Sequence, residues 1–306
     1  MPPSSGIARP PSLRARASPL PSLPSAAKPS ESRLGPWHLT QVLRRGALTT
    51  LYRARPAEAK GELGCYVVKT FAASGAQRDL ARAMLAREAA VGQAVNHPHL
   101  ATVLAADLVA DQPYVVRPYL DGITLRQFLD RQRSLPLASA LWIARQVAES
   151  LTVLHRAGWL HGQVQPEHVI VAPSGHATLI DTSLCRRLET TECEGGDVRP
   201  GSIAYAAPET FLHRGRLTTA SEIYSLGISL YEMLASRPPF QAADAAQLAR
   251  LHRTIAPPDL RAARPDLPPE AAYIIRLMLT KEPLRRPSVA ELVRWLAELE
   301  IAALAP

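Results

Sequence analysis

The stretch HGQVQPEHVIV at residues 161–171, together with LID at 179–181, carries the most informative pattern in this 306-residue chain. Two short strand-like runs, 168–171 and 177–180, lie in or beside it. A helix is predicted just before it, because apolar residues recur at helical spacing along one face. These residues are Leu137, Leu141, Ala144, Val147, Leu151 and Leu154. After it we expect an unstructured stretch to about residue 207.

Further outward, the two halves of the chain have different patterns. The first half contains strand-like runs at 38–43, 50–55, 65–71, 102–108 and 113–119, with one helical stretch at 77–95. The second half contains helical patterns at 220–235, 243–254, 269–279 and 288–303. The sequence therefore predicts an α+β fold with two lobes. A small β-rich lobe spans 37–120 and a larger helical lobe spans 121–303.

Composition excludes several classes of protein. Hydrophobic residues make up 47% of the chain, which is enough to build a core and rules out wholesale disorder. No apolar run is long enough for a membrane-spanning helix, and the N-terminus lacks the apolar stretch of a secretory signal. The three cysteines, Cys65, Cys185 and Cys193, show no metal-binding or disulfide spacing. We therefore expect a cytoplasmic protein.

Residues 1–36 form a separate compositional unit with nine prolines and eight serines. Such a segment cannot build a periodic apolar face, so a disordered tail is predicted, either a docking segment for a proline-recognising partner or a solvated tail without a role. It carries five basic residues against one acid, about half of the net charge of +8. The remaining charge is too dilute for a nucleic-acid partner.

The order of the landmarks from residue 38 to about 300 resembles the protein kinase family, most closely the bacterial serine/threonine kinases. The landmarks are YVVKTF at 66–71, REA at 87–89, HGQVQPEHVIV at 161–171, LID at 179–181, GSIAYAAPE at 201–209, SEIYSLGISLYEMLASRPPF at 221–240 and PLRRPS at 283–288. The resemblance implies the bilobal kinase-like fold, with ATP and Mg²⁺ as the family's cofactors.

Four residues match positions with which the family binds nucleotide and metal. Lys69 corresponds to the phosphate-pairing lysine and Glu88 to its partner on the helix. Gly46 is the one glycine kept in the phosphate-covering loop, where Arg44 and Thr49 replace the other two, so an ordinary hairpin turn is favoured there. Asp181 corresponds to the metal-binding aspartate and is predicted to hold a divalent ion weakly.

The catalytic loop departs from the family at three positions. Gln163 replaces the aspartate that receives the acceptor proton, and an amide has no useful basicity near neutral pH. Gln165 replaces the lysine that faces the transferred phosphate. His168 replaces the asparagine that supplies the second metal ligand, and imidazole suits Mg²⁺ poorly. No catalytic residue is therefore expected, and Glu167 is discounted as a substitute base.

Other replacements affect the nucleotide slot and the activation segment. Val67 narrows the slot, and Arg117 places a charge in it that costs desolvation energy unless it meets an acid. Thr182 and Ser183 replace the residues after the metal-binding aspartate. The arginine that receives an activating phosphate is absent at Gly162, so Thr190, Thr191 and Ser202 are poor phosphorylation candidates.

The scaffold of the helical lobe is retained. Glu209 and Arg286 are expected to form a buried ion pair, whose truncation would cost about 3–5 kcal/mol. Glu222 replaces an aspartate that braces the catalytic loop from below, and His161 is expected to be a structural hydrogen-bonding residue.

The sequence thus predicts a pseudokinase: a kinase-fold domain with little or no phosphotransfer that acts as a scaffold or allosteric regulator of an active kinase or another signalling protein. Two alternatives stay open. One is a weakly active or atypical ATP-dependent serine/threonine kinase that uses Lys69, Glu88 and Asp181. The other is a sensor of anions or phospho-ligands that uses Arg117 and Arg44 in the old nucleotide cleft.

Overall fold

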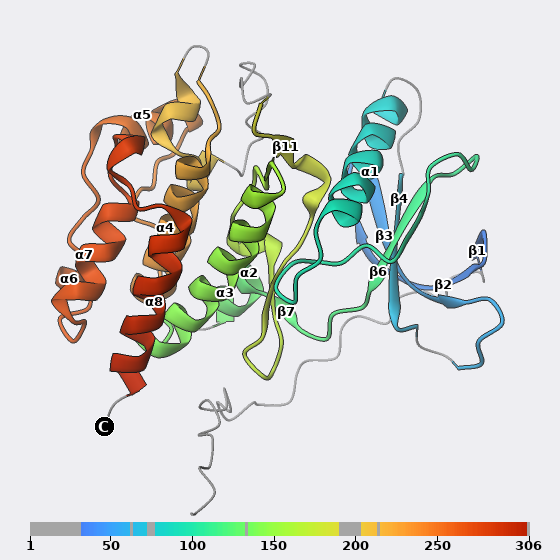
Figure 1. The fold of residues 1–306 in the computed structure, drawn as a ribbon, viewed down its shortest axis with the longest axis horizontal. Helices are drawn as coiled ribbons and strands as arrows, with labels where there is room; N and C mark the ends of the chain where they lie inside the picture. Colours follow the sequence, from blue (N-terminus) through green and yellow to red (C-terminus); the bar gives the residue numbers. More distant parts are fainter. Residues whose placement is uncertain are drawn as a thin grey trace, which may run out of the picture.

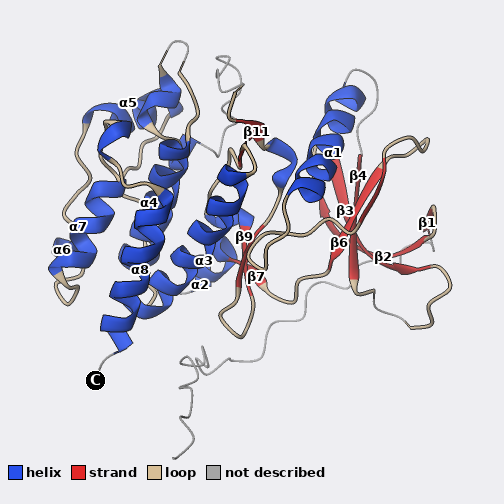
Figure 2. Ribbon diagram, viewed as in Figure 1, coloured by secondary structure: helices blue, strands red, loops and turns tan. Residues whose placement is uncertain are grey.

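The computed structural model describes residues 32–61, 64–71, 77–131, 134–189, 203–212 and 215–304. Figure 1 shows a sheet with one helix at one end of the molecule and a body of helices at the other end. In Figure 2 the strands gather at the first end and the helices at the second. The α+β, two-lobed arrangement predicted from the sequence is confirmed.

Six antiparallel strands form the main sheet in the order β1-β2-β3-β4-β6-β5. Their bounds are β1 (Ser32–Leu34), β2 (Trp37–Arg45), β3 (Thr49–Pro56), β4 (Tyr66–Phe71), β5 (Ala105–Asp107) and β6 (Tyr114–Pro118). The five predicted strand runs are all present, and the run at 102–108 is shortened to β5.

The two faces of the sheet have separate apolar contacts, as the alternation of side chains along a strand requires. On one face, Tyr114 and Val116 of β6 pack with Leu39 of β2. On the other face, Val115 packs with Leu85 of helix α1 (Gln77–Ala94). Alternation therefore directs Arg117, two residues after Val115, toward α1.

The sheet begins earlier than the sequence indicates. The sequence predicts a disordered tail over residues 1–36, but residues 32–34 form β1, which pairs with β2 through Arg33 and His38. Leu34 is buried in the same cluster as Leu39 and Val68. The sheet therefore begins at Ser32, five residues before Trp37, and residues 1–31 lie outside the described part of the chain.

Seven α-helices among the described residues follow the sheet. They are α2 (Leu125–Arg131), α3 (Leu137–Arg156), α4 (Thr219–Ala235), α5 (Ala245–Thr254), α6 (Leu260–Ala263), α7 (Pro269–Met278) and α8 (Val289–Leu304). The predicted buried face of α3 is confirmed, because Leu141, Val147 and Leu151 lie in the core together with buried residues of α4 and α8.

The strand-like runs predicted at 168–171 and 177–180 are present, and further short elements that the sequence did not indicate lie beside them. A three-stranded sheet joins β7 (Ile123–Thr124), β9 (Val169–Val171) and β10 (Ala177–Leu179), and β8 (Trp159–Leu160) pairs with β11 (Arg186–Arg187). The expected unstructured stretch to residue 207 is therefore wrong for its first part, which contains β11 and the 3₁₀ turn η2 (Thr182–Leu184). Its later part, 190–202, lies outside the described residues.

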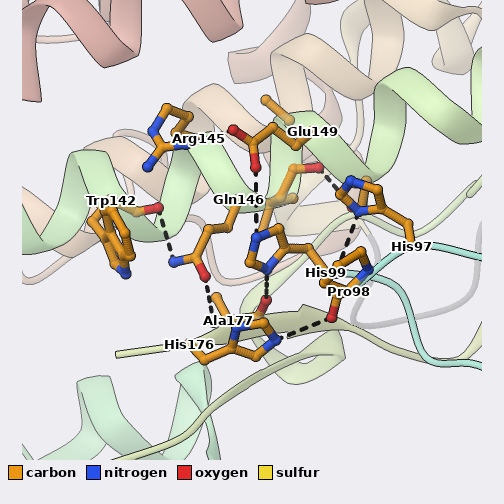
Figure 3. A network of polar contacts seen from close by, with 12 residues as sticks. His97, Pro98, His99, Trp142, Arg145, Gln146, Glu149, His176 and Ala177 are labelled. Carbon is orange, nitrogen blue, oxygen red and sulfur yellow. Dashed lines mark hydrogen bonds and ion pairs between the residues drawn. The ribbon is translucent and has the colours of Figure 1, made fainter. Parts of the chain in front are cut away.

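A polar network, shown in Figure 3, fastens the loop after α1 to the helical lobe. His99 Nδ1 donates to the carbonyl of Ala177 at 2.9 Å, and its Nε2 lies 3.5 Å from a carboxylate oxygen of Glu149 on α3. His176 donates to the carbonyl of Pro98 at 3.0 Å. The end of α1 is thus tied to α3 and to the β9–β10 hairpin, the same hairpin that precedes Asp181.

None of the helices in the described part of the chain is both long and apolar enough to cross a membrane.

Candidate functional site

Three charged residues from three separate elements meet between the lobes. Lys69 on β4 donates to Glu88 on α1 at 2.8 Å and to Asp181, which directly precedes η2, at 2.7 Å. Lys69 and Glu88 are buried, and the side chain of Asp181 is 26% exposed. The structure therefore brings together three of the four residues predicted to bind cofactor.

Their mutual contacts shift the pKa of Lys69 and the pKa of Asp181 toward the charged forms. Burial favours the neutral amine of Lys69, but Glu88 and then Asp181 outweigh it, so the pKa of Lys69 is raised. Burial likewise opposes ionisation of Asp181, yet Lys69 and then His168 hold the pKa of Asp181 well below its ordinary value. One buried ammonium group thus links the sheet, helix α1 and the start of η2.

Arg117 is the fourth charged member of this cluster. Its guanidinium Nη1 lies 3.2 Å from Glu88 Oε1, the oxygen that Lys69 does not use, and Arg117 is buried. Glu88 therefore faces two cations, one on each carboxylate oxygen. The acid needed to offset the desolvation of Arg117 is present, and it comes from α1.

Asp181 is held in a strained backbone conformation. Its φ of 67° lies in the left-handed region, which costs an ordinary residue about 1–3 kcal/mol and occurs often at functional sites. Ser183 donates its hydroxyl to Asp181 Oδ1 at 2.6 Å, the same oxygen that accepts from Lys69. In the sequence Ser183 is only a replacement in the motif, whereas in the structure its hydroxyl fixes the carboxylate of Asp181.

The loop at 161–168 is held from both sides by buried groups. His161 donates from Nε2 to the carbonyl of Ile180 at 3.0 Å and accepts from the backbone N–H of Gln163 at 3.3 Å. Burial lowers the pKa of His161, so the ring is neutral in its interior position. These contacts agree with the structural role expected for His161.

Glu222 on α4 braces the same loop despite its longer side chain. One oxygen accepts from the backbone N–H of Gly162 at 2.7 Å, and the other accepts from His155 Nε2 on α3, also at 2.7 Å. Gly162 has a φ of +83°, and an added Cβ would lie 2.9 Å from the carbonyl oxygen of Leu184. His155 is a partner that the sequence analysis missed, because it lies 67 residues before Glu222.

The donor set beside Asp181 does not fit Mg²⁺. His168 donates from Nδ1 to the carbonyl of Gln163 at 2.9 Å, which leaves Nε2 facing Asp181 Oδ2 at 3.9 Å. Asp181 Oδ1 already accepts from Lys69 and Ser183. Mg²⁺ prefers oxygen ligands in octahedral geometry, and the described residues contain no group of three or more metal-binding side chains.

The hairpin between β2 and β3 contains Gly46. The backbone N–H of Gly46 donates to the carbonyl of Thr49 at 2.9 Å, and Arg44, Arg45 and Gly46 are exposed. An added Cβ at Gly46 would meet only that carbonyl oxygen, at 3.1 Å. The geometry agrees with an ordinary hairpin turn, and Gly46 makes no contact with the Lys69 cluster.

Glu209 and Arg286 form the predicted ion pair in the helical lobe. Two parallel hydrogen bonds of 2.7 and 2.8 Å join the guanidinium to the carboxylate, and Ser221 donates to Glu209 at 2.6 Å. Arg286 also donates to the carbonyls of Thr280, Ala220 and Lys281. The pair anchors the segment after η3 (Ile203–Tyr205) to α4 and to the loop between α7 and α8.

Tyr205, at the end of η3, belongs to a further network that the sequence analysis missed. Its hydroxyl donates to Glu232 on α4 at 2.7 Å, and Arg126 on α2 donates to the other oxygen of Glu232 at 2.6 Å. Burial and then Glu232 raise the pKa of Tyr205.

Glu167, discounted as a base, keeps one buried carboxylate oxygen without a hydrogen-bond partner among the described residues.

We expect the free energy of unfolding to fall as the pH drops from about 6.5 to 4. His252 lies among aromatic rings of Tyr224 and Phe240, and burial, followed by Lys281, lowers its pKa to about 4. The unfolded state therefore binds the proton first, and this one group removes about 3 kcal/mol over that range. Burial lowers the pKa of His161 and His99 as well, so their effect has the same sign.

Urea unfolding at pH 7, 6, 5 and 4 measures this loss. The His252→Gln variant keeps an acceptor for the Tyr224 hydroxyl but does not titrate, so its stability should change much less with pH. If the free energy of unfolding fell equally with pH in the wild type and in His252→Gln, His252 would not be the responsible group.

The fold and site together define a domain of the protein kinase class: an antiparallel sheet with one helix, a lysine paired with that helix, and a braced loop beside an aspartate. A family model described as "Protein kinase domain" matches residues 37–295. The chain belongs to the protein kinase family.

The curated relatives of this chain include bacterial serine/threonine kinases. It is 28% identical over 265 residues to the serine/threonine-protein kinase AfsK of Streptomyces coelicolor, covering 87% of this chain and 32% of that one. It is 28% identical to the serine/threonine-protein kinase PknD of Mycobacterium tuberculosis, covering 83% and 38%, and 25% identical to the probable serine/threonine-protein kinase PknB of Lactococcus lactis, covering 76% and 36%. The chain spans about a third of the length of these relatives.

Proposed function

We propose that this chain is a pseudokinase, a kinase-fold domain that transfers phosphate little or not at all and acts by binding a signalling protein. The observation that carries the proposal is the loop at 161–168. His161 and Glu222 hold this loop by buried hydrogen bonds, yet the residue that matches the family's base is Gln163, an amide without useful basicity near neutral pH. The framework is kept while the group that performs the chemistry is absent.

The charged cluster supports the same proposal. Glu88 pairs with both Lys69 and Arg117, and Lys69 also pairs with Asp181, so the charges of these groups offset one another within the protein. Helix α1 is thereby held to the sheet by the chain's own charges. A domain with a self-stabilised cleft suits a scaffold or allosteric regulator, whose binding surface must not depend on a nucleotide.

We also propose a cellular compartment and a kind of binding partner for this protein. Among the described residues, Cys65 and Cys185 are free thiols, as a reducing cytoplasm would keep them, while Cys193 lies outside those residues. The expected partner is a protein, an active kinase or another signalling protein. The candidate phosphorylation residues Thr190, Thr191 and Ser202 also lie outside the described residues.

A weakly active or atypical kinase is the second candidate function. It is favoured by one observation, the contacts of Lys69 with Glu88 and Asp181 at 2.8 and 2.7 Å, since a kinase must hold its phosphate-binding lysine next to these two residues. The anion-sensor alternative is less well supported, because Glu88 neutralises Arg117 and Arg44 lies exposed on β2.

Thermal unfolding with ATP, with and without Mg²⁺, distinguishes these functions. We expect no Mg²⁺-dependent rise in Tm at millimolar nucleotide, because the donor set at His168 and Asp181 suits Mg²⁺ poorly. A ligand at 100 times its Kd would add about 2.7 kcal/mol and raise Tm by roughly several degrees. Such a shift, present in the wild type and absent in Lys69→Ala and Asp181→Ala, would favour the kinase instead. A shift with ATP alone that Asp181→Ala leaves unchanged would favour the sensor.

A further inference from the structure

A hollow of about 560 Å³ lies on the helical lobe where residues of α4, α6 and α7 meet. Figure 1 shows α6 and α7 at the opposite end of the molecule from the main sheet, so this hollow is remote from the charged cluster of Lys69. Core residues of the lobe, Leu260, Ile275 and Leu279, line its base. Its volume lies within the range of about 300–1,000 Å³ that is usual for small-ligand sites.

The walls of the hollow are apolar and rich in rings. Pro257 and Pro258 lie just before α6, and Pro269 is the first residue of α7. Because the proline ring locks the backbone φ, these segments have little freedom to change shape. Tyr273 of α7 adds an aromatic ring that is 51% exposed. The apolar part of a ligand can pack against these ring surfaces.

Two arginines give the hollow its positive charge. Arg261 of α6 and Arg276 of α7 both line it, and both are exposed. Within the described part of the chain, neither guanidinium forms an ion pair with a carboxylate. The guanidinium of Arg276 lies 5.5 Å from the centre of the Tyr273 ring, so it stands beside the apolar wall. Both guanidinium groups are therefore available to an anion.

One acid also lines the hollow, and it sets the charge of the ligand that would fit. Asp259 accepts the backbone N–H of Arg261 at 3.0 Å and thereby caps α6. Two guanidinium groups and one carboxylate leave a single positive charge in excess. This balance favours a ligand with one negative charge over a phosphate monoester, which carries about −1.5 to −2 at pH 7.

A buried tyrosine supplies a hydrogen-bond donor to the same hollow. Tyr231 of α4 is only 4% exposed, yet its hydroxyl has no hydrogen-bond partner among the residues that the structure describes. Burial raises the pKa of this hydroxyl, so it stays protonated at neutral pH. Buried tyrosine hydroxyls usually find an acceptor, and a carboxylate in the hollow would supply one.

The neighbouring surface has the opposite charge. A second hollow, between α7 and α8, shares Pro269 and Tyr273 with the first, but its charged residues are Glu270 and Glu298. The ring of Tyr273 thus stands between an acidic hollow and a basic one. An anion is directed to the side of Arg261 and Arg276.

We propose that the hollow between α4, α6 and α7 binds a small organic monoanion that carries a carboxylate on an apolar body. The carboxylate pairs with Arg261 and Arg276 and accepts the Tyr231 hydroxyl, and the apolar body packs against Pro257 and Tyr273. Charge-assisted contacts of this kind are stronger than those between neutral groups. The ligand would join three helices at a place separate from the nucleotide cleft, so this inference does not depend on whether the cleft transfers phosphate.

Equilibrium dialysis of the full chain against 2-naphthoate, followed by the fluorescence of the naphthalene ring, tests the proposal. We expect one saturable site per chain. The pair Arg261→Gln and Arg276→Gln should raise Kd at least about tenfold, since hydrogen bonds to charged groups contribute about 1.5–3 kcal/mol. Tyr231→Phe removes the hydroxyl but keeps the ring in the core, and it should raise Kd by a similar factor. Thermal unfolding without ligand checks that each variant is folded.

Two further ligands with the same ring separate charge from shape. 2-Naphthamide has no charge, and 2-naphthyl phosphate carries a larger negative charge than the carboxylate. Both should bind more weakly than 2-naphthoate, the amide by at least about tenfold. Equal binding of the amide would show an apolar site without anion recognition, and tighter binding of the phosphate would show that Asp259 does not limit the charge. Either result would overturn the proposal.

A matched control removes two arginines outside the hollow. Arg285 and Arg294 are 72% and 66% exposed and line neither of the two hollows. The pair Arg285→Gln and Arg294→Gln changes the net charge by the same amount and should leave Kd unchanged. Equal weakening by this pair would show only general charge attraction and would contradict a built site. Absence of saturable binding, or binding that Tyr231→Phe or the Arg261 and Arg276 pair leaves intact, would contradict it as well.

Discussion

Replacing Glu209 by Gln should lower the free energy of unfolding by about 3–5 kcal/mol, because the change leaves a buried arginine without its counterion. The side chain of Arg286 is fully buried and bonds to Glu209 through two parallel contacts. The amide keeps the shape of the carboxylate, so lost packing cannot account for the effect. Because small domains are stable by only about 5–15 kcal/mol, this substitution should make the fold marginal.

A second glutamate–arginine pair in the same part of the chain provides the control. Glu282 and Arg285 lie 2.6 Å apart but are 65% and 72% exposed. Exposed pairs contribute about 0–1 kcal/mol, so Glu282→Gln should change stability little. Urea unfolding of the two variants gives the comparison. If Glu209→Gln cost no more than Glu282→Gln, burial of the pair would not be what anchors the segment after η3.

The double variant Glu209→Gln with Arg286→Met adds a further test. Without the guanidinium there is no uncompensated buried cation, so stability should recover part of the loss seen in Glu209→Gln alone. The recovery should be incomplete, since Thr280, Ala220 and Lys281 would lose the donors that Arg286 supplies to their carbonyls.

Most of the fold could be predicted because each long helix or strand shows its apolar periodicity within its own stretch of sequence. The helical spacing from Leu137 to Leu154 identified α3 from local sequence alone. β1 was missed because its three residues lie next to prolines and serines, and it is stabilised by its pairing with β2 and by the packing of Leu34 in the apolar cluster of the sheet. Short strands of two residues, such as β7, carry no periodicity at all and are formed by their pairing partners.

The candidate site was predictable where residues match a motif and less so where partners come from distant segments. Lys69, Glu88 and Asp181 were expected, and the structure brings them together. The need of Arg117 for an acid was also expected, but its partner was not. The partner is Glu88, because the alternation of side chains along β6 directs Arg117 toward α1. This pairing can be recognised only when the positions of the sheet and the helix are known.

The role of Ser183 was missed for a different reason. Its hydroxyl reaches back two residues to Asp181, which depends on the left-handed backbone at Asp181. No local pattern indicates a left-handed aspartate, since glycine is the residue that normally marks that conformation. The resemblance drew attention to what Ser183 replaces and not to the hydrogen bond that it makes.

Restoring three residues of the catalytic loop should produce the largest functional change. We expect Gln163→Asp, Gln165→Lys and His168→Asn together to raise phosphotransfer at least about 100-fold, the lower range for a positioned general base. The loop is already braced by His161 and Glu222, so the new side chains enter a preformed backbone. Transfer of labelled phosphate from ATP with Mg²⁺, to the chain itself or a generic protein, measures the rate.

The two proteins compared, with the wild-type loop and with the restored loop, should both also carry Arg117→Met. That change removes the charge from the nucleotide slot and leaves Glu88 paired with Lys69, so any difference in rate arises at the loop. Adding Asp181→Asn to the restored chain should return the rate to the background, since it removes the remaining carboxylate for a metal. A wild-type rate that already equals the restored rate and disappears with Asp181→Asn would identify a working kinase and contradict the pseudokinase proposal. No gain in a restored chain that binds nucleotide would show that Gln163, Gln165 and His168 are not what limits the reaction.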